Sequence, residues 1–400
     1  MSSAGGLSRR RVPASVSTGN NDDDVDGSWG FNGSSASANG GGGGGSGSIS
    51  RSDSLQSPPL HAGSAFEGGS KIAYDPRDLE REDEDARLGG RPPRLTIMEE
   101  VLLLGLKDKQ GYLSFWNDNI SYALRGCILI ELALRRRIGL VRDPNRRVLP
   151  LAERVVEVLD ERQTGETILD EALRMMKGQE PQERMSVNSW IDLLSGETWN
   201  VMKIGFQLKQ VRERLAKGLV DKGVLRTEKR NFLLFDMATH PVADVRTKEG
   251  IVTRVVSLLT STTSAVPGSA LDKEGTQCRV MRAVCLVCAA YAASVLDNAF
   301  GRLTYEDREG AFQRCDEILA EFSAWPFGSS SGGGGGGGRA GAARRREGAR
   351  IGMGSAGVSS REVVLGLVQE VKKEMHGEED VCFELVAGVL EVLSKLDSLL

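Results

Sequence analysis

Apolar residues recur at helical spacing along most of the chain from residue 97 onward. Within each segment they fall three or four positions apart, so they line one face of an α-helix. The first segment follows Thr96, and Glu99 stands three positions later, a spacing typical of the capping box that starts a helix. The pattern predicts a mainly α fold with helices at 97–106, 118–137, 151–159, 167–177, 187–195, 200–221, 247–260, 277–300, 306–323, 361–375 and 381–400.

Two short stretches interrupt the helical spacing, and each follows a predicted helix. Short apolar runs there flank polar, turn-forming residues, which is typical of β-hairpins. The first hairpin is predicted with strands 138–142 and 147–149, and the second with strands 223–226 and 232–235. The expected fold is therefore a helical domain with short appended hairpins.

Low-complexity segments set the expected boundaries of this domain. The chain has 49 glycines, many of them in the runs 40–45 and 332–338. Segments this poor in apolar residues cannot bury a core, so we expect disorder there. The predicted organisation is a disordered tail over residues 1–91 and one helical domain over 92–400, interrupted by a low-complexity insertion at 328–360.

Charge, cysteine content and hydropathy narrow the class of protein. The net charge is −4, so any binding of anions must come from a local cluster of cations. The six cysteines follow no regular spacing and no secretory leader precedes them, which favours reduced thiols in the cytosol. The most apolar stretch, 283–296, is shorter than the roughly 20 residues of a transmembrane helix. We expect a protein that does not span a membrane.

The sequence offers no carrier for catalysis, a metal or a cofactor. It lacks a zinc-protease HExxH motif, a P-loop and a nucleophile elbow between a strand and a helix. Cys285 and Cys288 have metal-like spacing, but they lie among apolar residues of a predicted helix, so we interpret them as core residues. His240 and His376 have no evident nucleophile partner. We predict neither an enzyme nor a cofactor-binding protein.

Trp116 and Arg125 are candidates for contact with a charged lipid headgroup. Trp116 lies in a polar, turn-prone segment before a helix, where a membrane-facing ring and a ring filling a gap between helices are both open interpretations. Arg125 lies beside the apolar stripe of its helix, since Leu129 and Leu132 follow at i+4 and i+7. A buried arginine requires a carboxylate or a phosphate, so a structural ion pair is the alternative.

Lys209 and Arg212 form a second pair of candidate residues. They lie three positions apart along the edge of the predicted helix 200–221. Arg212 has no acidic residue at i±4, whereas Lys209 can pair with Glu213. Two cations held on one helix suit a phosphomonoester, and the Lys209–Glu213 pair is the alternative.

Several blocks of the chain resemble the signature blocks of the Golgi phosphoprotein 3 family. The similarity is greatest to the fungal branch of that family, and it covers roughly residues 92–327 and 361–400. The matching blocks are 95–105, 111–118, 124–126, 193–200, 211–217 and 231–236.

The resemblance implies a mainly helical domain that binds phosphatidylinositol 4-phosphate. It places the family's headgroup residues on Trp116, Arg125, Lys209 and Arg212 of this chain. It also implies a peripheral protein on the cytosolic side of the Golgi membrane with a cytosolic pool, and no catalytic residue. Departures from the family pattern are confined to the low-complexity tail and to the insertion at 328–360.

The resemblance assigns further roles to the second hairpin and to the start of the chain. Hairpin residues Leu233, Leu234 and Phe235 are implied in membrane insertion or self-association. The family links cytosolic tails of Golgi glycosyltransferases to the retrograde vesicle coat. The residues implied in coat binding here are Arg9, Arg10 and Arg11.

A winged-helix-like nucleic-acid-binding protein is the alternative interpretation, because the chain has two helix-plus-hairpin units. The arginines at 135–137, 142, 146 and 147 keep it open. However, the strand predicted at 232–235 is apolar, and such a strand gains burial against lipid or another protomer but nothing against phosphates. We therefore expect no nucleic-acid partner.

Overall fold

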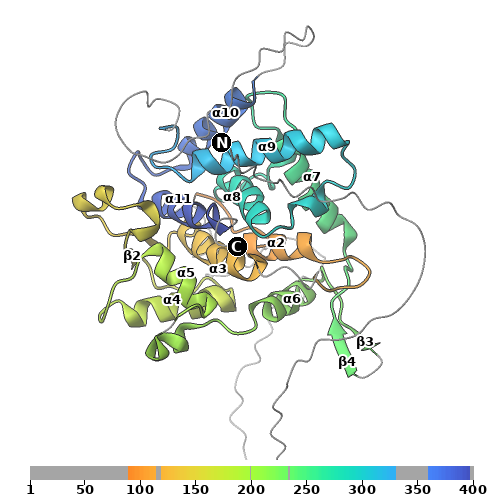
Figure 1. The fold of residues 1–400 in the computed structure, drawn as a ribbon, viewed down its shortest axis with the longest axis horizontal. Coiled ribbons are helices and arrows are strands. Elements are labelled where there is room, and N and C mark those ends of the chain that lie inside the picture. Colours follow the sequence, from red (N-terminus) through yellow and green to blue (C-terminus); the bar gives the residue numbers. More distant parts are fainter. Residues whose placement is uncertain (1–88, 114–118, 199, 233–234, 330–358, 397–400) are drawn as a thin grey trace, which may run out of the picture. The chain divides into compact units, whose positions relative to one another are not determined.

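A computed structural model describes residues 89–113, 119–198, 200–232, 235–329 and 359–396 of the 400-residue chain. In these ranges the fold is mainly α, as predicted, with ten α-helices and two small antiparallel hairpins (Figure 1). The helices are α2 (Ile97–Gly105), α3 (Asn119–Leu134), α4 (Thr167–Gln179), α5 (Val187–Ser195), α6 (Val211–Asp221), α7 (Val245–Leu259), α8 (Arg279–Ala292), α9 (Tyr305–Phe322), α10 (Ser360–Glu374) and α11 (Val381–Leu393).

Short 3-10 helices and strands connect these elements. The 3-10 helices are η1 (Pro144–Val148), η2 (Leu151–Glu153), η3 (Val201–Phe206), η4 (Gly268–Ala270) and η5 (Leu296–Ala299). Strand β1 (Ile138–Leu140) pairs with β2 (Val156–Val158), and β3 (Glu228–Phe232) pairs with β4 (Phe235–Thr239).

Local sequence signals fix several helix ends as predicted. The capping box of α2 is present: the Thr96 hydroxyl accepts a hydrogen bond from the Glu99 amide, and the Glu99 carboxylate accepts one from the Thr96 amide at 2.8 Å. Helix α5 starts at the cap residue Ser186 and ends at Gly196, whose φ of 84° is the left-handed conformation that glycine adopts readily.

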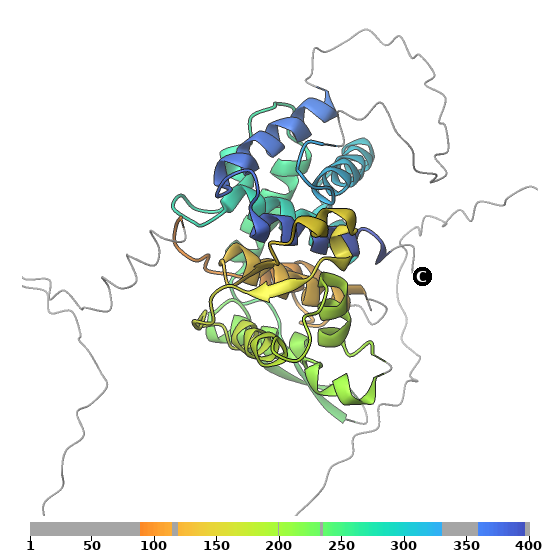
Figure 2. The ribbon, with the colours of Figure 1, turned by 90° about the vertical axis from the view of Figure 1, so that its left-hand side faces the viewer.

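Helix α3 lies at the centre of the core and packs against α2, α5, α8 and α11. In both views, α2, α3 and α11 lie between α8–α10 on one side and α4–α6 on the other (Figures 1 and 2). Gly126 allows α3 and α11 to approach closely, because a Cβ atom there would meet Val389 and Leu393 at 3.2 Å. Almost every residue of α3 is buried, so charged side chains on this helix need partners inside the protein.

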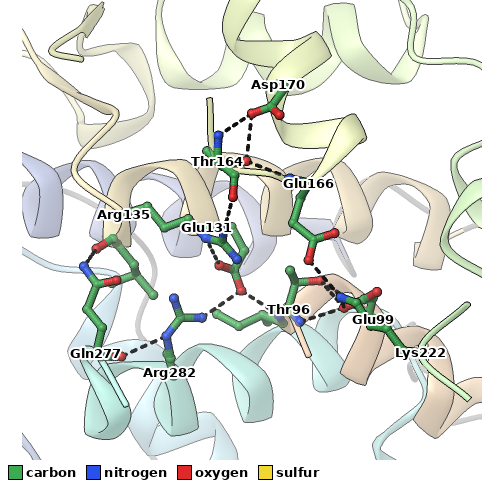
Figure 3. Close-up of polar contacts among 12 residues, drawn as sticks. Thr96, Glu99, Glu131, Arg135, Thr164, Glu166, Asp170, Lys222, Gln277 and Arg282 are labelled. Atoms are coloured by element: carbon green, nitrogen blue, oxygen red, sulfur yellow. Dashed lines mark hydrogen bonds and ion pairs between the residues drawn. The ribbon is translucent and has the colours of Figure 1, made fainter. Parts of the chain in front are cut away.

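Glu131 of α3 is a fully buried carboxylate with such partners (Figure 3). It accepts hydrogen bonds from the Ile97 amide at 2.7 Å, from Arg282 at 2.8 Å and from Arg135 at 3.2 Å. Burial alone would raise the pKa of Glu131, but the charges of Arg282 and Arg135 outweigh burial and lower it to about 2. The carboxylate therefore joins α2, α3 and α8 in its ionised form.

Lys222 fixes the carboxyl end of α6 (Figure 3). Its ammonium group lies 2.8 Å from the carboxylates of both Glu99 and Glu166. These ion pairs attach the carboxyl end of α6 to the first turn of α2 and to the start of α4. The amino end of α6 is the other end of the helix, away from these ion pairs. Partly buried ion pairs of this kind orient a helix more than surface pairs do.

Three helix predictions were wrong in whole or in part. The segment predicted as a helix at 151–159 forms η2 and then β2, because β2 pairs with β1 across 15 intervening residues. The helix predicted at 200–221 is interrupted: η3 ends at Phe206, and α6 starts only at Val211. The helix predicted at 277–300 also stops early, at Ala292, and η5 follows. Tertiary contacts override helical spacing at each of these places.

Two hairpins exist, as predicted, but their strands differ from the prediction. Residues 223–226 form no strand, and Leu225 makes only an isolated bridge to Val242. Residues 147–149 contribute to η1 rather than to a strand, and the partner of β1 is β2. In the second hairpin, Phe232 ends one strand and Phe235 begins the other, so 232–235 is not a single strand. The register runs from the pair Glu228–Thr239 to the pair Phe232–Phe235.

The core prediction for the cysteines is confirmed. All six are buried, and Cys285 and Cys288 lie on the inward side of α8. Burial raises the pKa of both thiols, so they behave as apolar core residues. Among the described residues, no helix combines the length and apolar character needed to cross a membrane.

Candidate functional site

Helix α6 begins without a side-chain cap. Gln210, the residue before it, has a φ of 53°, which is the left-handed region, and its side chain makes no capping hydrogen bond. The first internal bond of the helix runs from the Arg214 amide to the Gln210 carbonyl oxygen at 2.9 Å. Amides of the first turn therefore point out of the helix end, where the helix dipole favours an anion.

Arg125 of α3 contacts the segment that leads into this helix end. Its guanidinium donates to three backbone carbonyl oxygens: Ser121 at 2.9 Å, Leu208 at 2.8 Å and Leu194 at 3.3 Å. These carbonyls belong to α3, to α5 and to the segment just before α6. Arg125 thus holds that segment in place, and with it the start of α6.

Arg125 is buried, only 7% exposed, but no carboxylate contacts it within the described ranges. Among the described residues, the ion pair considered as its structural alternative is therefore not formed. Burial lowers the pKa of Arg125 to about 10, with a further contribution from the positive charge of Arg212, and Glu213 offsets this only in part. A second cation this close to a buried arginine favours an anion between or beside the two side chains.

Lys209 and Arg212 are both exposed and flank the start of α6. The structure corrects one prediction, since Lys209 precedes the helix and only Arg212 lies on it. Among the described residues neither makes an ion pair, so the alternative pairing of Lys209 with Glu213 is not formed either. The arrangement combines two accessible cations, one buried arginine and outward-pointing amides, which together suit the oxygens of a phosphate group.

Several predicted site residues cannot be placed relative to this surface. Phe235 begins β4, but its side chain is not among those described. The other residues that lie outside the described ranges are Trp116, Leu233, Leu234, Arg9, Arg10 and Arg11.

The predicted site residues that are described, Arg125, Lys209 and Arg212, come together at the amino end of α6. Sequence reasoning missed Gln210, whose left-handed conformation ends the preceding segment and opens the helix end. Gly205, inside the predicted helix 200–221, is a residue that weakens helices, and it was the available signal for a break.

Most of the arginines behind the nucleic-acid alternative are paired inside the protein. Arg135 contacts Glu131, Arg136 contacts Asp380, and Arg137 contacts Asp160. Arg146 lies 3.0 Å from the buried Glu384, and Arg147 contacts Glu379. These pairs neutralise the charge that a recognition helix or wing would present to DNA.

Arg142, Arg146, Arg147 and His376 line an open pocket of about 520 Å³ together with Glu379. Only Arg142 among these arginines lacks an ion-pair partner in the described part of the chain. The pocket is therefore less cationic than its composition suggests, and the amino end of α6 is the stronger candidate for an anion-binding surface.

The fold and this surface define a class: a mainly helical protein with a phosphate-compatible cationic surface at a helix start. Comparison with known protein families gives the relatives of this chain. The family description Golgi phosphoprotein 3 matches residues 97–346. The chain is 52% identical over 343 residues to the vacuolar protein sorting-associated protein 74 of Schizosaccharomyces pombe, covering 85% of this chain and 92% of that protein.

A second relative is the vacuolar protein sorting-associated protein 74 of Eremothecium gossypii, at 48% identity over 330 residues. That alignment covers 82% of this chain and 90% of the relative. The chain belongs to the Golgi phosphoprotein 3 family. Membership indicates a Golgi-associated function in protein transport.

Proposed function

We propose that this protein is a peripheral adaptor on the cytosolic face of the Golgi membrane that binds phosphatidylinositol 4-phosphate and is not an enzyme. Trp116, Arg125, Lys209 and Arg212 are the proposed headgroup residues. The proposal rests on membership of the family and on the cationic surface at the start of α6.

The single observation that carries the proposal is the environment of Arg125. A buried guanidinium normally takes a carboxylate, as Arg282 takes Glu131 at 2.8 Å. Arg125 instead rests on carbonyl oxygens with the charge of Arg212 close by, and the pKa of Arg125 falls to about 10. A phosphate dianion at this point would relieve the repulsion between the two cations and accept hydrogen bonds from the backbone amides in the first turn of α6.

The proposed partners follow from the family. The adaptor would bind cytosolic tails of Golgi glycosyltransferases and link them to the retrograde vesicle coat, retaining those enzymes in the Golgi. Arg9, Arg10 and Arg11 would bind the coat, since three arginines in one short segment suit an acidic surface. The second hairpin, with Leu233, Leu234 and Phe235, would insert into the membrane or join two protomers.

Co-sedimentation with vesicles tests the lipid assignment. Phosphatidylcholine vesicles would carry phosphatidylinositol or one phosphoinositide isomer at a time, with duplex DNA as a soluble competitor. We expect the strongest binding to the 4-phosphate and no competition by DNA. Equal binding to phosphatidylinositol and to every isomer would overturn the proposal, and displacement by DNA would favour the nucleic-acid alternative.

Variants make this assay specific to the site. Arg212→Ala should weaken binding to 4-phosphate vesicles about ten- to hundredfold, since a charge-assisted contact is worth roughly 1.5–3 kcal/mol. Arg302→Ala is the matched control, because Arg302 is also an exposed arginine and its ion-pair partner among the described residues is the exposed Glu249. The control should bind like the unchanged protein.

Deletion of residues 2–15 tests the coat assignment. The truncated protein should lose capture of the vesicle coat complex, because the three arginines are removed, and should keep its binding to 4-phosphate vesicles. Equal coat capture by the full-length and truncated proteins would contradict the role proposed for the arginines.

A further inference from the structure

The 3-10 helix η3 exposes apolar side chains directly before the cationic surface. Val201 is 77% exposed, Met202 88% and Ile204 48%. Large apolar residues exposed this far are normally scattered singly over a surface. Here three of them fall within four consecutive positions, and Lys209 follows Ile204 by five residues.

The geometry of η3 explains why these side chains face outward. A 3-10 helix has three residues per turn, so residues three apart share a face. One face carries Lys203 and Phe206, which dock onto the domain: Lys203 lies 2.7 Å from Glu183, and Phe206 packs edge-to-face on Trp190 at 5.9 Å between ring centres. The other two faces carry Val201 with Ile204, and Met202 with Gly205.

The two open faces of η3 are thus entirely apolar. The one cation of this element, Lys203, lies on the docked face and is paired with Glu183. Phe206 and the Trp190 ring of α5 anchor the carboxyl end of η3. Two residues further on, the Leu208 amide donates to the Leu194 carbonyl at 3.1 Å, and the Leu208 carbonyl accepts from Arg125. The apolar faces are therefore rigidly connected to the proposed headgroup site.

We propose that Val201, Met202 and Ile204 enter the interfacial layer of the bilayer when the cationic surface holds a lipid phosphate. This inference rests on the proposed function and adds a second contact to it. A lipid surface presents anionic groups and apolar chains side by side, which is the arrangement that η3 and the start of α6 present to it.

A second copy of this chain fits these faces less well. A stable protein interface buries about 800 Å² on each partner, and three side chains of this size supply only part of that area. Insertion into lipid requires no matching surface, and a few apolar side chains contribute usefully when a charged contact is already made.

An environment-sensitive fluorophore can report insertion directly. All six native cysteines are buried, so a cysteine introduced by Met202→Cys is the preferred site for a thiol-reactive nitrobenzoxadiazole probe. Tyr305→Cys is the matched control, since Tyr305 is 78% exposed and begins α9. Helix α9 lies on the other side of α3 from α5 and α6 in both views (Figures 1 and 2).

With vesicles containing phosphatidylinositol 4-phosphate, the probe at 202 should brighten and shift to the blue, while the probe at 305 should not change. A probe at 202 that still reports water while the protein co-sediments with those vesicles would overturn the inference. Failure of the unchanged protein to prefer 4-phosphate vesicles would instead overturn the proposed function, so the two failures are distinguishable.

A double substitution provides the second measurement. Met202→Ser with Ile204→Ser should weaken binding to 4-phosphate vesicles about tenfold or more, because two apolar side chains no longer enter the bilayer. Its affinity for soluble inositol 1,4-bisphosphate should stay unchanged, whereas Arg212→Ala lowers both. Unchanged vesicle binding by the double variant contradicts insertion. If light scattering without lipid gives a lower mass for the double variant than for the unchanged protein, the apolar faces of η3 join two copies of the chain, and this result also contradicts insertion.

Discussion

Helices α6 and α8 begin in the same way and are completed differently. Gln210 before α6 and Cys278 before α8 both adopt the left-handed conformation, with φ of 53° and 48°, and neither side chain caps its helix. At α8 the carboxylate of Glu374 accepts the amides of Val280 at 2.8 Å and Met281 at 3.0 Å. An acidic side chain of the protein itself thus closes the start of α8.

No carboxylate does the same for α6 in the described part of the chain. Lys209 and Arg212 flank that helix end instead, and both are exposed. The helix dipole at the start of α6 adds to the positive charge of these side chains, whereas at α8 Glu374 neutralises it. The start of α6 is therefore the helix end that we propose to receive a negative group from outside the protein.

The buried arginines near these helix ends show the same contrast. For Arg282, burial acts to lower the pKa, but the charge of Glu131 and the hydrogen bond to it outweigh burial and raise the pKa. For Arg125, burial and the charge of Arg212 act in the same direction, and the pKa falls to about 10. Arg282 serves the fold through an internal carboxylate, whereas Arg125 has only oxygen atoms without charge as described partners, and we propose that an external anion supplies the missing charge.

The largest effect is expected when the internal pair is broken. Glu131→Gln should lower the free energy of unfolding by about 3–5 kcal/mol, because Arg282 and Arg135 would remain buried without a carboxylate. Denaturant titration measures this loss. Glu249→Gln, at an exposed ion pair with Arg302, is the control and should change stability little. A loss below about 1 kcal/mol for Glu131→Gln would remove the distinction between the two arginines.

The same pair predicts a dependence of stability on pH. The pKa of Glu131 is about 2 in the folded protein and near 4.5 when unfolded. A lowered folded pKa means that the ionised carboxylate stabilises the fold above pH 4.5, and that this contribution is lost as the pH falls toward 2. The stability difference between the unchanged protein and Glu131→Gln should therefore shrink by about 2 kcal/mol between pH 5 and pH 3. A constant difference would contradict the assignment.

A smaller loss is expected at the start of α8. Glu374→Ala should destabilise the protein by about 1–3 kcal/mol, since the amides of Val280 and Met281 would lose their acceptor. The variant should bind inositol 1,4-bisphosphate like the unchanged protein, because the proposed anion site is at the other helix. Calorimetric unfolding and a headgroup titration check the two parts, and reduced headgroup affinity would show that the two helix ends are not independent.

The helical part of the fold was predictable wherever local signals determine it. The capping box at Thr96 and the cap at Ser186 place α2 and α5 at the residues expected from the sequence. Gly205 signalled a break in the helix predicted at 200–221, but the start of α6 after Gln210 was not predictable, because contacts from distant elements fix the segment before it. Leu208 bonds to Leu194 and to Arg125, residues 14 and 83 positions away.

The candidate site was predictable in its composition but not in its geometry. An arginine beside an apolar stripe signals a required partner, and Arg125 was found in that way. That its partners are carbonyl oxygens, and that Lys209 lies off the helix, depends on tertiary packing. The pairing of the arginines at 135–137 and 146–147 with acidic residues far along the chain is likewise invisible to local spacing.

The most direct test of the central claim is a calorimetric titration of the protein with inositol 1,4-bisphosphate. The unchanged protein should bind, and the affinity of Arg212→Ala should be lower by about tenfold or more. The unfolding temperature of this variant should stay unchanged, because Arg212 is exposed. Arg302→Ala, the matched exposed arginine, should bind like the unchanged protein. Equal affinity of the Arg212 and Arg302 variants would contradict the claim that the start of α6 receives an external phosphate.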